Sequence, residues 1–424
     1  MNEKTAQWLV WDRQHCWHPF TNQLDWCDPS FEPLIIERGQ GVWLWDSEGR
    51  KYFDGNSSIW TNIHGHSHPH INAAMKAQIE EISHSSFLGF GNARASELAA
   101  ALCDFFPSNT LERVFFSDDG STAVECAVKM ALQYRMQSGK PQRTKLVAFA
   151  NAYHGDTMGA ASLGGVSLFF ERFRKFGMDV SFVRNLDELY LLDNTTISAV
   201  VIEPLIQGVN QMHLWPTGML KQLRNWCNAK DVHLILDEVM TGFGRSGTMF
   251  ACEQEDVIPD FLCLAKGLTG GYLPLAATMT TDAIYRAFLG SENTFYYGHS
   301  YTANPLGCAA ALANLQLFKT ENTLADIRAK SDEFGKLLED NFSRHVIRRC
   351  GMMSGIEVRQ NNDSPYAASE QVGARICYAA RNHGLLTRPI RDTIVLMPPL
   401  CSTIEELRYA VNALSAAMED VCGA

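Results

Sequence analysis

One lysine, Lys266, directly follows a short apolar run at 261–265 and precedes a glycine cluster. The run predicts a buried strand that ends at this lysine. Burial lowers the pKa of an ammonium group, because a poorly solvated site disfavours the charged form. The resulting neutral amine can attack a carbonyl and form a Schiff base. A solvated lysine that merely ends a strand is the alternative, because most lysines lie at the surface.

Gly120 and Ser121 mark a second candidate site, where an apolar run passes into a helical pattern of apolar residues at 123–131. Glycine lets the backbone approach a ligand, and the free N–H groups and dipole of a helix start favour a phosphate. The preceding Asp118 and Asp119 would repel an anion if they faced it. Simple N-capping by Ser121 is therefore the alternative.

Two further strand ends carry Asp237 and Tyr153. Asp237 could hold a protonated heterocyclic nitrogen, and a helix cap or a metal ligand is the alternative. Tyr153 follows the predicted strand at 145–149 and can stack on a planar cofactor, unless it lies in an ordinary loop. A phosphate cradle, a stacking aromatic, a carboxylate and a nucleophilic lysine together meet the requirements of pyridoxal 5′-phosphate. The sequence therefore predicts this cofactor.

Two other motifs are less specific. The run 242–247 matches G-x-G-x-x-G, but the acidic pair separates it from the strand and no long helix follows, which argues against a dinucleotide site. Histidines alternate at positions 64, 66, 68 and 70 without helical or Cys/His ligand spacing. We expect this segment to be a loop beside the active site, and we predict no metal.

The elements that must position these residues alternate between strands and helices. Helices are expected notably at 121–137 and 219–230, and strands at 113–116, 145–149, 180–183, 199–203, 233–237 and 261–265. Such alternation predicts a mostly parallel, doubly wound sheet with ligands at the carboxyl ends of its strands. We expect a large cofactor-binding domain at 71–318, and a small domain formed by the N-terminal segment 1–70 and the C-terminal segment 319–424.

Composition restricts the partners and the compartment. The 424 residues carry a net charge of -11, which argues against nucleic acid or an anionic membrane surface as the main partner. The 12 cysteines are scattered singly, as expected for reduced thiols in the cytosol. No signal peptide is recognisable, and no apolar run approaches the roughly 20 residues of a membrane span. We expect a soluble, cytoplasmic protein that acts on small molecules.

The order of the motifs resembles that of the class III, fold-type I aminotransferases over nearly the whole chain. These motifs are Gly-Ser-Thr-Ala-Val-Glu at 120–125, Tyr-His-Gly at 153–155, Asp-Glu-Val-Met-Thr-Gly-Phe-Gly-Arg at 237–245, Lys-Gly at 266–267 and Asn-Pro-Leu at 304–306. The resemblance implies a seven-stranded, mostly parallel sheet with helices on both faces, plus a smaller α/β domain from both termini. It also implies that Lys266 is the Schiff-base lysine and Asp237 the partner of the pyridinium nitrogen. Gly120 and Ser121 would hold the phosphate, and Tyr153 would border the ring and the substrate.

Within that class, segments 17–21, 57–60, 152–157 and 388–399 resemble the aminotransferases of biotin synthesis. Those enzymes convert 8-amino-7-oxononanoate to 7,8-diaminononanoate, usually with S-adenosyl-L-methionine as amino donor. The resemblance implies that Arg388 binds the donor's carboxylate. It further implies a homodimer with shared active sites. In that homodimer His299 and Ser300 bind cofactor, with Ser300 on the phosphate of the other subunit, and Gly298 borders the substrate.

Two departures from that pattern concern the amino donor. Phe20 stands where adenosylmethionine-using members have tyrosine, and Ile59 replaces the first of two tryptophans, while Trp60 keeps the second. Phe20 and Trp60 would line the substrate mouth. Members similar to this chain at 385–390 and 298–301 include some that use L-lysine, so the donor stays open. The alternatives are an ω-aminotransferase for diamines, ornithine or γ-aminobutyrate, and a noncatalytic protein that keeps the fold.

Overall fold

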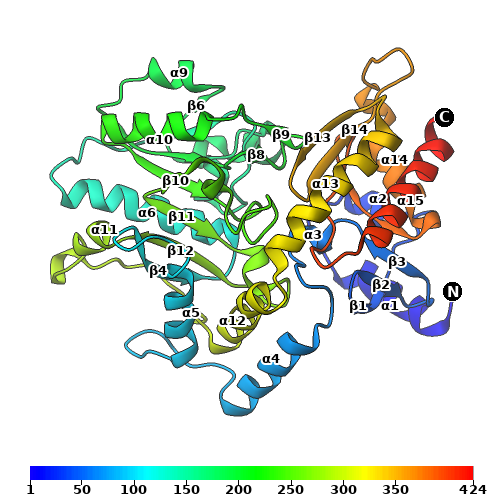
Figure 1. Ribbon diagram of the computed structural model, residues 1–424, viewed down its shortest axis with the longest axis horizontal. Coiled ribbons are helices and arrows are strands. Elements are labelled where there is room, and N and C mark those ends of the chain that lie inside the picture. The colour runs from blue at the N-terminus through cyan, green and yellow to red at the C-terminus, as the bar shows by residue number, and fades with distance from the viewer. Residues whose placement is uncertain (424) are drawn as a thin grey trace.

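The computed structural model describes residues 1–423 as a large α/β body and a smaller body that contains both ends of the chain (Figure 1). A seven-stranded sheet forms the centre of the large body. Its spatial order is β4 (Leu111–Ser117), β12 (Ala276–Thr281), β11 (Phe261–Leu264), β10 (His233–Asp237), β7 (Ile197–Ile202), β5 (Lys145–Phe149) and β6 (Val180–Val183). Only β12 runs antiparallel to its neighbours in this sheet. The predicted mostly parallel sheet is thereby confirmed.

The strand β12 was not predicted from the sequence pattern. It inserts between β4 and β11, and its first five residues are buried. Its sequence, Ala-Ala-Thr-Met-Thr-Thr, has neither the apolar run of the other central strands nor a clear alternation. Small side chains suit this place, because helix α6 (Gly120–Gln137) packs closely against β11 and β12.

Alternate residues of the strands point to opposite faces of the sheet, and each face has its own helices. On β10, Ile235 belongs to the cluster with α6, whereas Leu234 and Leu236 belong to the opposite one. Burial on both faces explains why most residues of β7 and the central residues of β10 are apolar. The opposite face packs against α5 (Ala93–Cys103), α10 (Met219–Lys230) and α12 (Pro305–Thr320). Other helices of this body are α4 (Pro69–Glu81), α7 (Met158–Ser162), α8 (Ser167–Phe170), α9 (Leu186–Tyr190) and α11 (Asp282–Arg286).

The smaller body joins residues from both ends of the chain. One sheet contains a hairpin of β2 (Trp43–Asp46) and β3 (Lys51–Asp54); β1 (Ile36–Gln40) pairs with β2, and β15 (Leu385–Leu386) adds to β3. A second sheet has the order β13 (Val346–Cys350), β14 (Met353–Glu357), β17 (Thr393–Leu396) and β16 (Arg388–Ile390). The helices are α1 (Glu3–His15), α2 (Gln23–Cys27), α3 (Ser57–Trp60), α13 (Thr323–Phe342), α14 (Val372–Ala379) and α15 (Ile404–Cys422).

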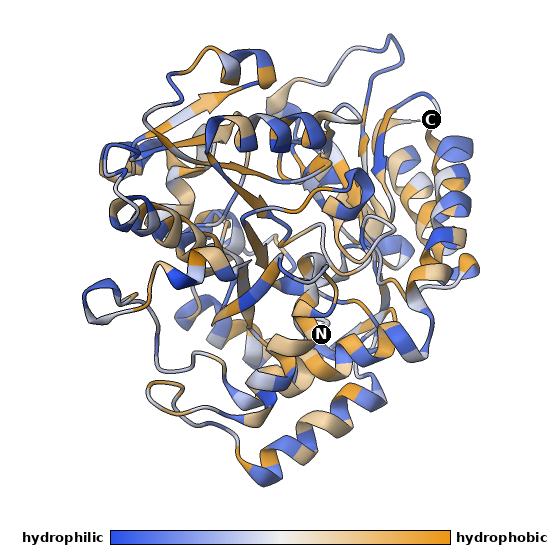
Figure 2. Ribbon diagram, turned by 60° about the vertical axis from the view of Figure 1, so that its left-hand side comes forward, coloured by the Kyte–Doolittle hydropathy of each residue, from blue (hydrophilic) through white to orange (hydrophobic). Residues whose placement is uncertain are grey.

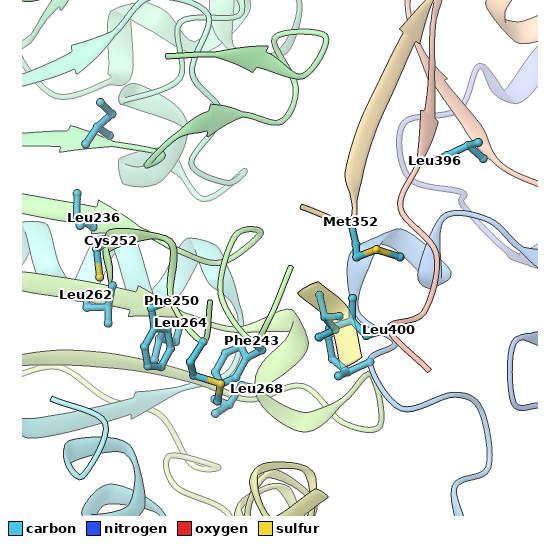
Figure 3. Close-up of a cluster of buried hydrophobic side chains, with 14 of the residues drawn as sticks. Leu236, Phe243, Phe250, Cys252, Leu262, Leu264, Leu268, Met352, Leu396 and Leu400 are labelled. Carbon is cyan, nitrogen blue, oxygen red and sulfur yellow. The ribbon is translucent and has the colours of Figure 1, made fainter. Parts of the chain in front are cut away.

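Apolar side chains connect the two bodies. A continuous cluster runs from Leu236 and Leu262 on the central sheet, through Phe243, to Met352 and Leu400 in the smaller body (Figure 3). The ribbon coloured by hydropathy places apolar residues along the central strands and polar residues on outward helix faces (Figure 2). The N- and C-terminal segments are thus held against the sheet by burial of apolar surface.

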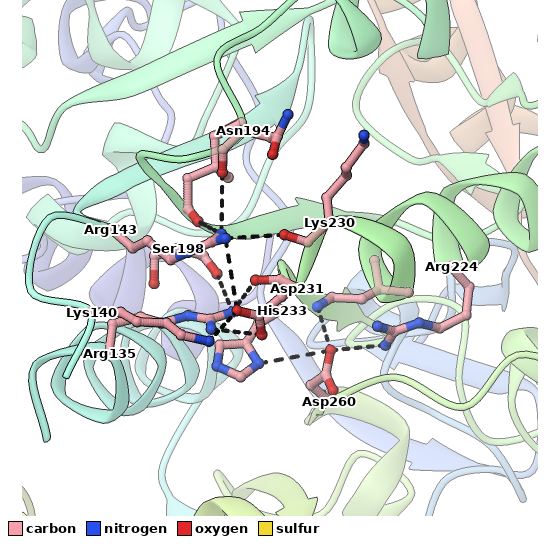
Figure 4. A network of polar contacts seen from close by, with 12 residues as sticks. Arg135, Lys140, Arg143, Asn194, Ser198, Arg224, Lys230, Asp231, His233 and Asp260 are labelled. Atoms are coloured by element: carbon pink, nitrogen blue, oxygen red, sulfur yellow. Dashed lines mark hydrogen bonds and ion pairs between the residues drawn. The ribbon is translucent and has the colours of Figure 1, made fainter. Parts of the chain in front are cut away.

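A polar network ties the end of α6 to the loop between α10 and β10 (Figure 4). The buried Arg135 donates to Asp231 Oδ1 at 3.0 Å and to the Asp231 carbonyl oxygen at 2.8 Å. Lys140 also donates to this carboxylate, at 2.5 Å, and Arg143 lies 3.7 Å from it. Burial by itself would raise the pKa of Asp231, but the hydrogen bonds from Lys140 and Arg135 lower it below the ordinary value.

Across residues 1–423, no helix combines the length and the apolar character that crossing a membrane would require. All twelve cysteines are free.

Candidate active site

Five strand ends of the central sheet converge on one cavity of about 400 Å³, called here the inner cavity. This volume is typical of a site for a small molecule. Ligand sites of open α/β sheets form at this edge, beyond the carboxyl ends of the strands. The candidate residues that line the inner cavity follow β4, β5, β7, β10 and β11 in turn: Gly120 and Ser121, Tyr153 and His154, Glu203, Asp237, and Lys266.

Lys266 is not a solvated surface lysine. Ala265 separates it from β11, and it lies at the start of a short 3₁₀ turn with φ +45°, where it lines the inner cavity. Burial lowers its pKa, although the charges of Asp237 and Glu203 act in the opposite direction. The Nζ atom lies 4.7 Å from the ring centroid of Trp60. The lysine is therefore held beside an aromatic ring, in a site that favours its neutral form more than water does.

Asp237 is held by a buried histidine. His154 Nδ1 lies 2.7 Å from Asp237 Oδ2, and the Val239 N–H donates to Asp237 Oδ1 at 3.1 Å. Burial by itself would lower the pKa of His154, but the hydrogen bond and charge of Asp237 raise it above the ordinary value. His154 therefore donates to the carboxylate and fixes its orientation toward the cavity.

The first turn of α6 forms an anion cradle beside these residues. Asp119, not Ser121, is the N-cap: its Oδ1 accepts from the Thr122 N–H at 2.9 Å. The N–H groups of Gly120 and Ser121 have no acceptor within the helix, as is general for a first turn. These groups and the dipole of an 18-residue helix favour a phosphate at this end of the cavity.

The loop after β5 packs directly on this turn. Ser121 Oγ accepts from the Asp156 N–H at 3.0 Å, and Tyr153 Oη donates to Asp156 Oδ2 at 2.5 Å. Burial, and then Asp156, raise the pKa of Tyr153. Gly155 has φ +120°, and a Cβ there would lie 2.0 Å from Ser121 Oγ. Only glycine allows this approach, which places the tyrosine and the cradle side by side.

The inner cavity fits a planar heterocycle that carries a phosphate. Gly120 closes the cradle tightly, because a Cβ there would lie 2.7 Å from Val239 Cγ1. N–H and hydroxyl groups lie at one end, the Asp237 carboxylate lines the wall, and Lys266 supplies an amine. These are the groups that pyridoxal 5′-phosphate needs in a protein.

A second hollow, the outer chamber, adjoins the first and shares Trp60, Tyr153, Val209 and Lys266 with it. Its volume is about 620 Å³. Most of the residues that line it have apolar or amide side chains. Its charged lining residues are all cationic. The remaining lining residues are Phe20, Asn56, Ile59, Asn151, Val166, Phe169, Asn210, Gln211, Arg388, Pro389, Ile390, Arg391 and Val395.

Three aromatic residues that line this chamber pack against one another. The ring of Phe20, from the N-terminal segment, packs edge-on against Phe169 with centroids 5.5 Å apart. Phe169 in turn packs edge-on against Tyr153 at 5.8 Å. The predicted substrate residues Phe20, Tyr153 and Trp60 are thus brought together around Lys266.

The segment Ser57–Trp60 is a left-handed helical turn, with φ between +46° and +68° at all four residues. This conformation is sterically unfavourable for residues other than glycine, so specific hydrogen bonds must stabilise it. Ser57 Oγ donates to the Met397 carbonyl oxygen at 2.6 Å, and Trp60 Nε1 donates to Asn56 Oδ1 at 2.7 Å. These bonds keep the Trp60 ring beside Lys266.

The fold of the single chain does not bring Gly298, His299 and Ser300 into either hollow. They belong to a loop without regular structure before Pro305, the first residue of α12. His299 Nδ1 lies 3.3 Å from Asp118 Oδ2, and Asp118 lines the inner cavity. The loop is therefore near the anion cradle but outside it.

Glu203 was missed as a site residue, although it ends a predicted strand just as Asp237 does. Its Oε2 accepts from the Gly208 N–H at 2.9 Å and its Oε1 from the Tyr153 N–H at 3.2 Å. Burial raises its pKa to about 7. Its position at the end of a predicted apolar strand was the sequence signal that could have identified Glu203. The contact of His154 with Asp237 was not predicted either, because it joins two loops 83 positions apart and has no local signal.

The two weaker motifs have structural roles. Arg245, in the glycine-rich run 242–247, is buried and donates to the carbonyl oxygens of Pro398 and Asn62 at 2.6 and 2.8 Å. In the histidine segment, His64 and His68 lie 3.8 and 3.4 Å from Glu321. Within residues 1–423 no group of three or more His, Cys, Asp or Glu side chains is arranged to hold a metal ion.

Comparisons with known proteins agree with this geometry. The model of the family "Aminotransferase class-III" matches residues 27–418. Two curated proteins, from Nitratidesulfovibrio vulgaris and Geobacter sulfurreducens, are named adenosylmethionine-8-amino-7-oxononanoate aminotransferase. The first is 44% identical over 98% of this chain and 82% of its own length. The second is 42% identical over 97% of each.

Solved structures share the whole fold. The structure of adenosylmethionine-8-amino-7-oxononanoate aminotransferase from Methanocaldococcus jannaschii superposes with a TM-score of 0.94, at 40% identity, covering 98% of this chain and 99% of the other. A thermostable (S)-enantioselective ω-transaminase from Thermomicrobium roseum has a TM-score of 0.91, at 30% identity, covering 98% of both. From the family match and these relatives, the chain belongs to the class III aminotransferases.

Proposed function

We propose that this chain transfers an amino group to 8-amino-7-oxononanoate, giving 7,8-diaminononanoate in biotin biosynthesis. The amino donor is S-adenosyl-L-methionine, with L-lysine as the alternative donor. The observation that carries the proposal is the outer chamber, which leads from Lys266 along an apolar wall to arginines and contains no carboxylate among its lining residues. An aliphatic oxo acid matches this combination of an apolar wall and a cationic end. Relatives of that name at 42–44% identity over nearly the whole chain support it.

Pyridoxal 5′-phosphate is the cofactor, and when bound it supplies an electron sink for the negative charge that develops on the reacting carbon of the substrate. Gly120 and Ser121 would hold its phosphate through N–H and hydroxyl groups. Asp237, fixed by His154, would hold its protonated ring nitrogen, and Tyr153 would border its ring. These assignments rest on the residues that meet in the inner cavity.

Lys266 would act as nucleophile, base and acid in turn. Burial favours its neutral amine, which can attack a carbonyl and take a proton from a substrate carbon. Once protonated, Nζ lies over the electron-rich face of Trp60, a contact that stabilises an ammonium group. The same proton can then be returned at a neighbouring carbon. A noncatalytic protein would have no need for this lysine, so the intact Lys266 argues against that alternative.

Arg388 would bind a substrate carboxylate at the mouth of the outer chamber. It lies on β16 and lines the chamber with Lys266. A guanidinium group offers two parallel N–H donors to a carboxylate. The edge-to-face rings of Phe20 and Phe169 would cover the aliphatic part of the substrate and exclude water.

We also propose a homodimer with shared active sites, in which Ser300 binds the cofactor phosphate of the other subunit, His299 binds cofactor and Gly298 borders the substrate. Asn92 Nδ2 donates to the Ala303 carbonyl oxygen at 3.0 Å, which places segments 84–92 and 294–303 side by side. This surface exposes four large side chains, at 59–87% of their area: Leu88, Phe90, Tyr296 and Tyr301. An exposed apolar surface of this kind is typical of an interface.

The division of the chain into 1–70, 71–318 and 319–424 remains a proposal, as does a cytoplasmic location. Pairing of β15 with β3 supports a small domain drawn from both ends. Free cysteines throughout the chain support a reducing compartment.

The test combines absorbance, turnover and donor identity. The purified protein should show a visible absorbance that borohydride abolishes, and Lys266→Ala should lack both this response and turnover. Adenosylmethionine, lysine and simple ω-amines, each added alone, should then reveal which donor converts the bound cofactor. Complementation of a strain that lacks this biotin step, with donor feeding, tests the pathway. Full activity of Lys266→Ala, or no complementation by an active enzyme, would contradict the proposal.

An ω-aminotransferase that acts on diamines, ornithine or γ-aminobutyrate is the second candidate. It is favoured by the superposition on the ω-transaminase from Thermomicrobium roseum. Simple diamines fit the outer chamber poorly, because they carry no carboxylate to pair with its arginines. Conversion of the cofactor by ornithine or γ-aminobutyrate, but by neither adenosylmethionine nor lysine, would favour this candidate.

A further inference from the structure

The mouth of the outer chamber carries a second arginine, Arg391, beside Arg388. Arg388 lies on β16 and Arg391 in the turn that follows it. Both residues are exposed, and both line the chamber together with Lys266. Since these three are the only charged residues among the described ones that line it, the chamber presents cations to a substrate and no anion.

Arg391 occupies a backbone position that favours glycine. It is the first residue of the two-residue turn between β16 and β17, because Ile390 pairs with Thr393. Its φ is +54°, a conformation that glycine adopts without steric penalty and arginine does not. A non-glycine residue keeps a positive φ only where the surrounding structure holds its backbone in place. Such residues are more frequent at active sites and ligand-binding sites than elsewhere.

The surroundings of the turn hold Arg391 in this place. The next residue, Asp392, accepts from the Gly373 N–H through Oδ1 at 2.9 Å. A Cβ at Gly373 would lie 2.3 Å from the Arg391 carbonyl oxygen, so the start of α14 is packed against the turn. The backbone of the turn is thereby fixed in a position from which Arg391 lines the chamber.

We infer that Arg391 is a specificity-determining residue that binds, together with Arg388, the carboxylate at the far end of an aliphatic amino or oxo acid. The inference rests on the proposed function and deepens it. Donor and acceptor enter the chamber in turn, and each brings a carboxylate. Two guanidinium groups along one mouth can receive carboxylates of substrates that differ in length, whereas their apolar parts lie along the same wall.

The main test is Arg391→Gln, assayed with 8-amino-7-oxononanoate and with its methyl ester. For the acid, KM should rise about five- to tenfold with kcat nearly unchanged, because an exposed carboxylate contact contributes binding and no chemistry. For the uncharged ester, KM should change less than twofold. Arg375→Gln is the matched control, since it removes an exposed arginine of α14 that lines neither hollow.

Two further variants separate charge from backbone strain. Arg391→Gly relieves the positive φ, so it should be at least as stable as the wild type to heat and still show the raised KM. Arg391→Lys keeps a positive charge without the guanidinium fork and should give an intermediate KM. Equal KM values for the acid in wild type and Arg391→Gln, or equal effects on acid and ester, would overturn the inference.

Binding of a simple carboxylate tests the role of Arg391 independently of whether the protein turns over 8-amino-7-oxononanoate. Heptanoate, measured by titration calorimetry, should bind the wild-type holoenzyme more tightly than 1-heptanol does, and Arg391→Gln should remove most of the difference. If the wild type fails to turn over 8-amino-7-oxononanoate but shows this preference, the proposed function fails and the carboxylate site stands. No preference for heptanoate in the wild type would refute the carboxylate site itself.

Discussion

The contact between Gly155 and Ser121 gives a sharp prediction about cofactor binding. In Gly155→Ala, the new methyl group would lie 2.0 Å from Ser121 Oγ and 2.7 Å from Ser121 Cα. Real side chains do not approach this closely, so either the loop that carries Tyr153 or the first turn of α6 must move. Both lie at the phosphate end of the inner cavity.

The expected loss of cofactor affinity in Gly155→Ala can be estimated from the backbone strain and from the hydrogen bonds of Ser121 that are lost. An alanine at φ +120° costs roughly 1–3 kcal/mol, and losing the bond from the Asp156 N–H to Ser121 Oγ adds about 1 kcal/mol. Displacement of the Ser121 hydroxyl from a phosphate removes a charge-assisted hydrogen bond, at about 1.5–3 kcal/mol. We therefore expect the dissociation constant of pyridoxal 5′-phosphate to rise about 10- to 100-fold.

The assay is titration of the apoenzyme with the cofactor, followed by absorbance, together with thermal unfolding. Gly290→Ala is the matched control, because Gly290 has φ +107° and a Cβ there would meet no atom within 4 Å. It should lower stability through backbone strain alone and leave cofactor affinity unchanged. If Gly155→Ala binds the cofactor as tightly as Gly290→Ala does, the packing argument is wrong.

Three further predictions concern stability, each measured by urea unfolding. Asp231→Ala leaves the buried Arg135 without its carboxylate and should cost about 2 kcal/mol, whereas Asp256→Ala, at a similar left-handed position without an ion pair, should cost little. Glu203 has its pKa raised by burial from 4.5 to about 7, so the folded protein keeps a proton that the unfolded chain loses. Its contribution should therefore fall by about 3 kcal/mol between pH 4.5 and 7, and Glu203→Gln should lack this decline. Ile59→Gly relieves a φ of +65° and should stabilise the fold by about 1 kcal/mol; a loss of stability would contradict the strain argument.

The strand ends could be predicted from the sequence because their physical signal is local. Runs buried on both faces of a sheet are continuously apolar, so a polar residue at the end of such a run marks the edge where ligands bind. Asp237 and Lys266 were located in this way, and the structure places both in the inner cavity. The same rule, applied evenly, would have included Glu203.

Other parts of the site have no local signal. The left-handed turn Ser57–Trp60 contains no glycine, and a bond to Met397, 340 positions away from Ser57, helps to hold it. Arg391 reaches the chamber only because β16 and β17 pair and α14 packs against their turn. In the single chain, the loop that contains Ser300 lines neither the inner cavity nor the outer chamber. Features that depend on long-range contacts or on a second subunit cannot be derived from spacing along one chain.

Backbone strain is concentrated at the outer chamber, where many lining residues have positive φ. They are Phe20, Ile59, Trp60, Asn151, Gln211, Lys266 and Arg391. Strained residues persist only where the surrounding structure fixes them, and here the fixing contacts come from both bodies of the molecule. Of the residues proposed to hold the cofactor, Lys266 shares this strain, whereas Gly120, Ser121, Tyr153 and Asp237 have no positive φ. Substitutions that change the amino donor should therefore map to Phe20, Ile59 and Arg391, with a change in stability, and leave cofactor affinity at Ser121 and Asp237 nearly unaltered.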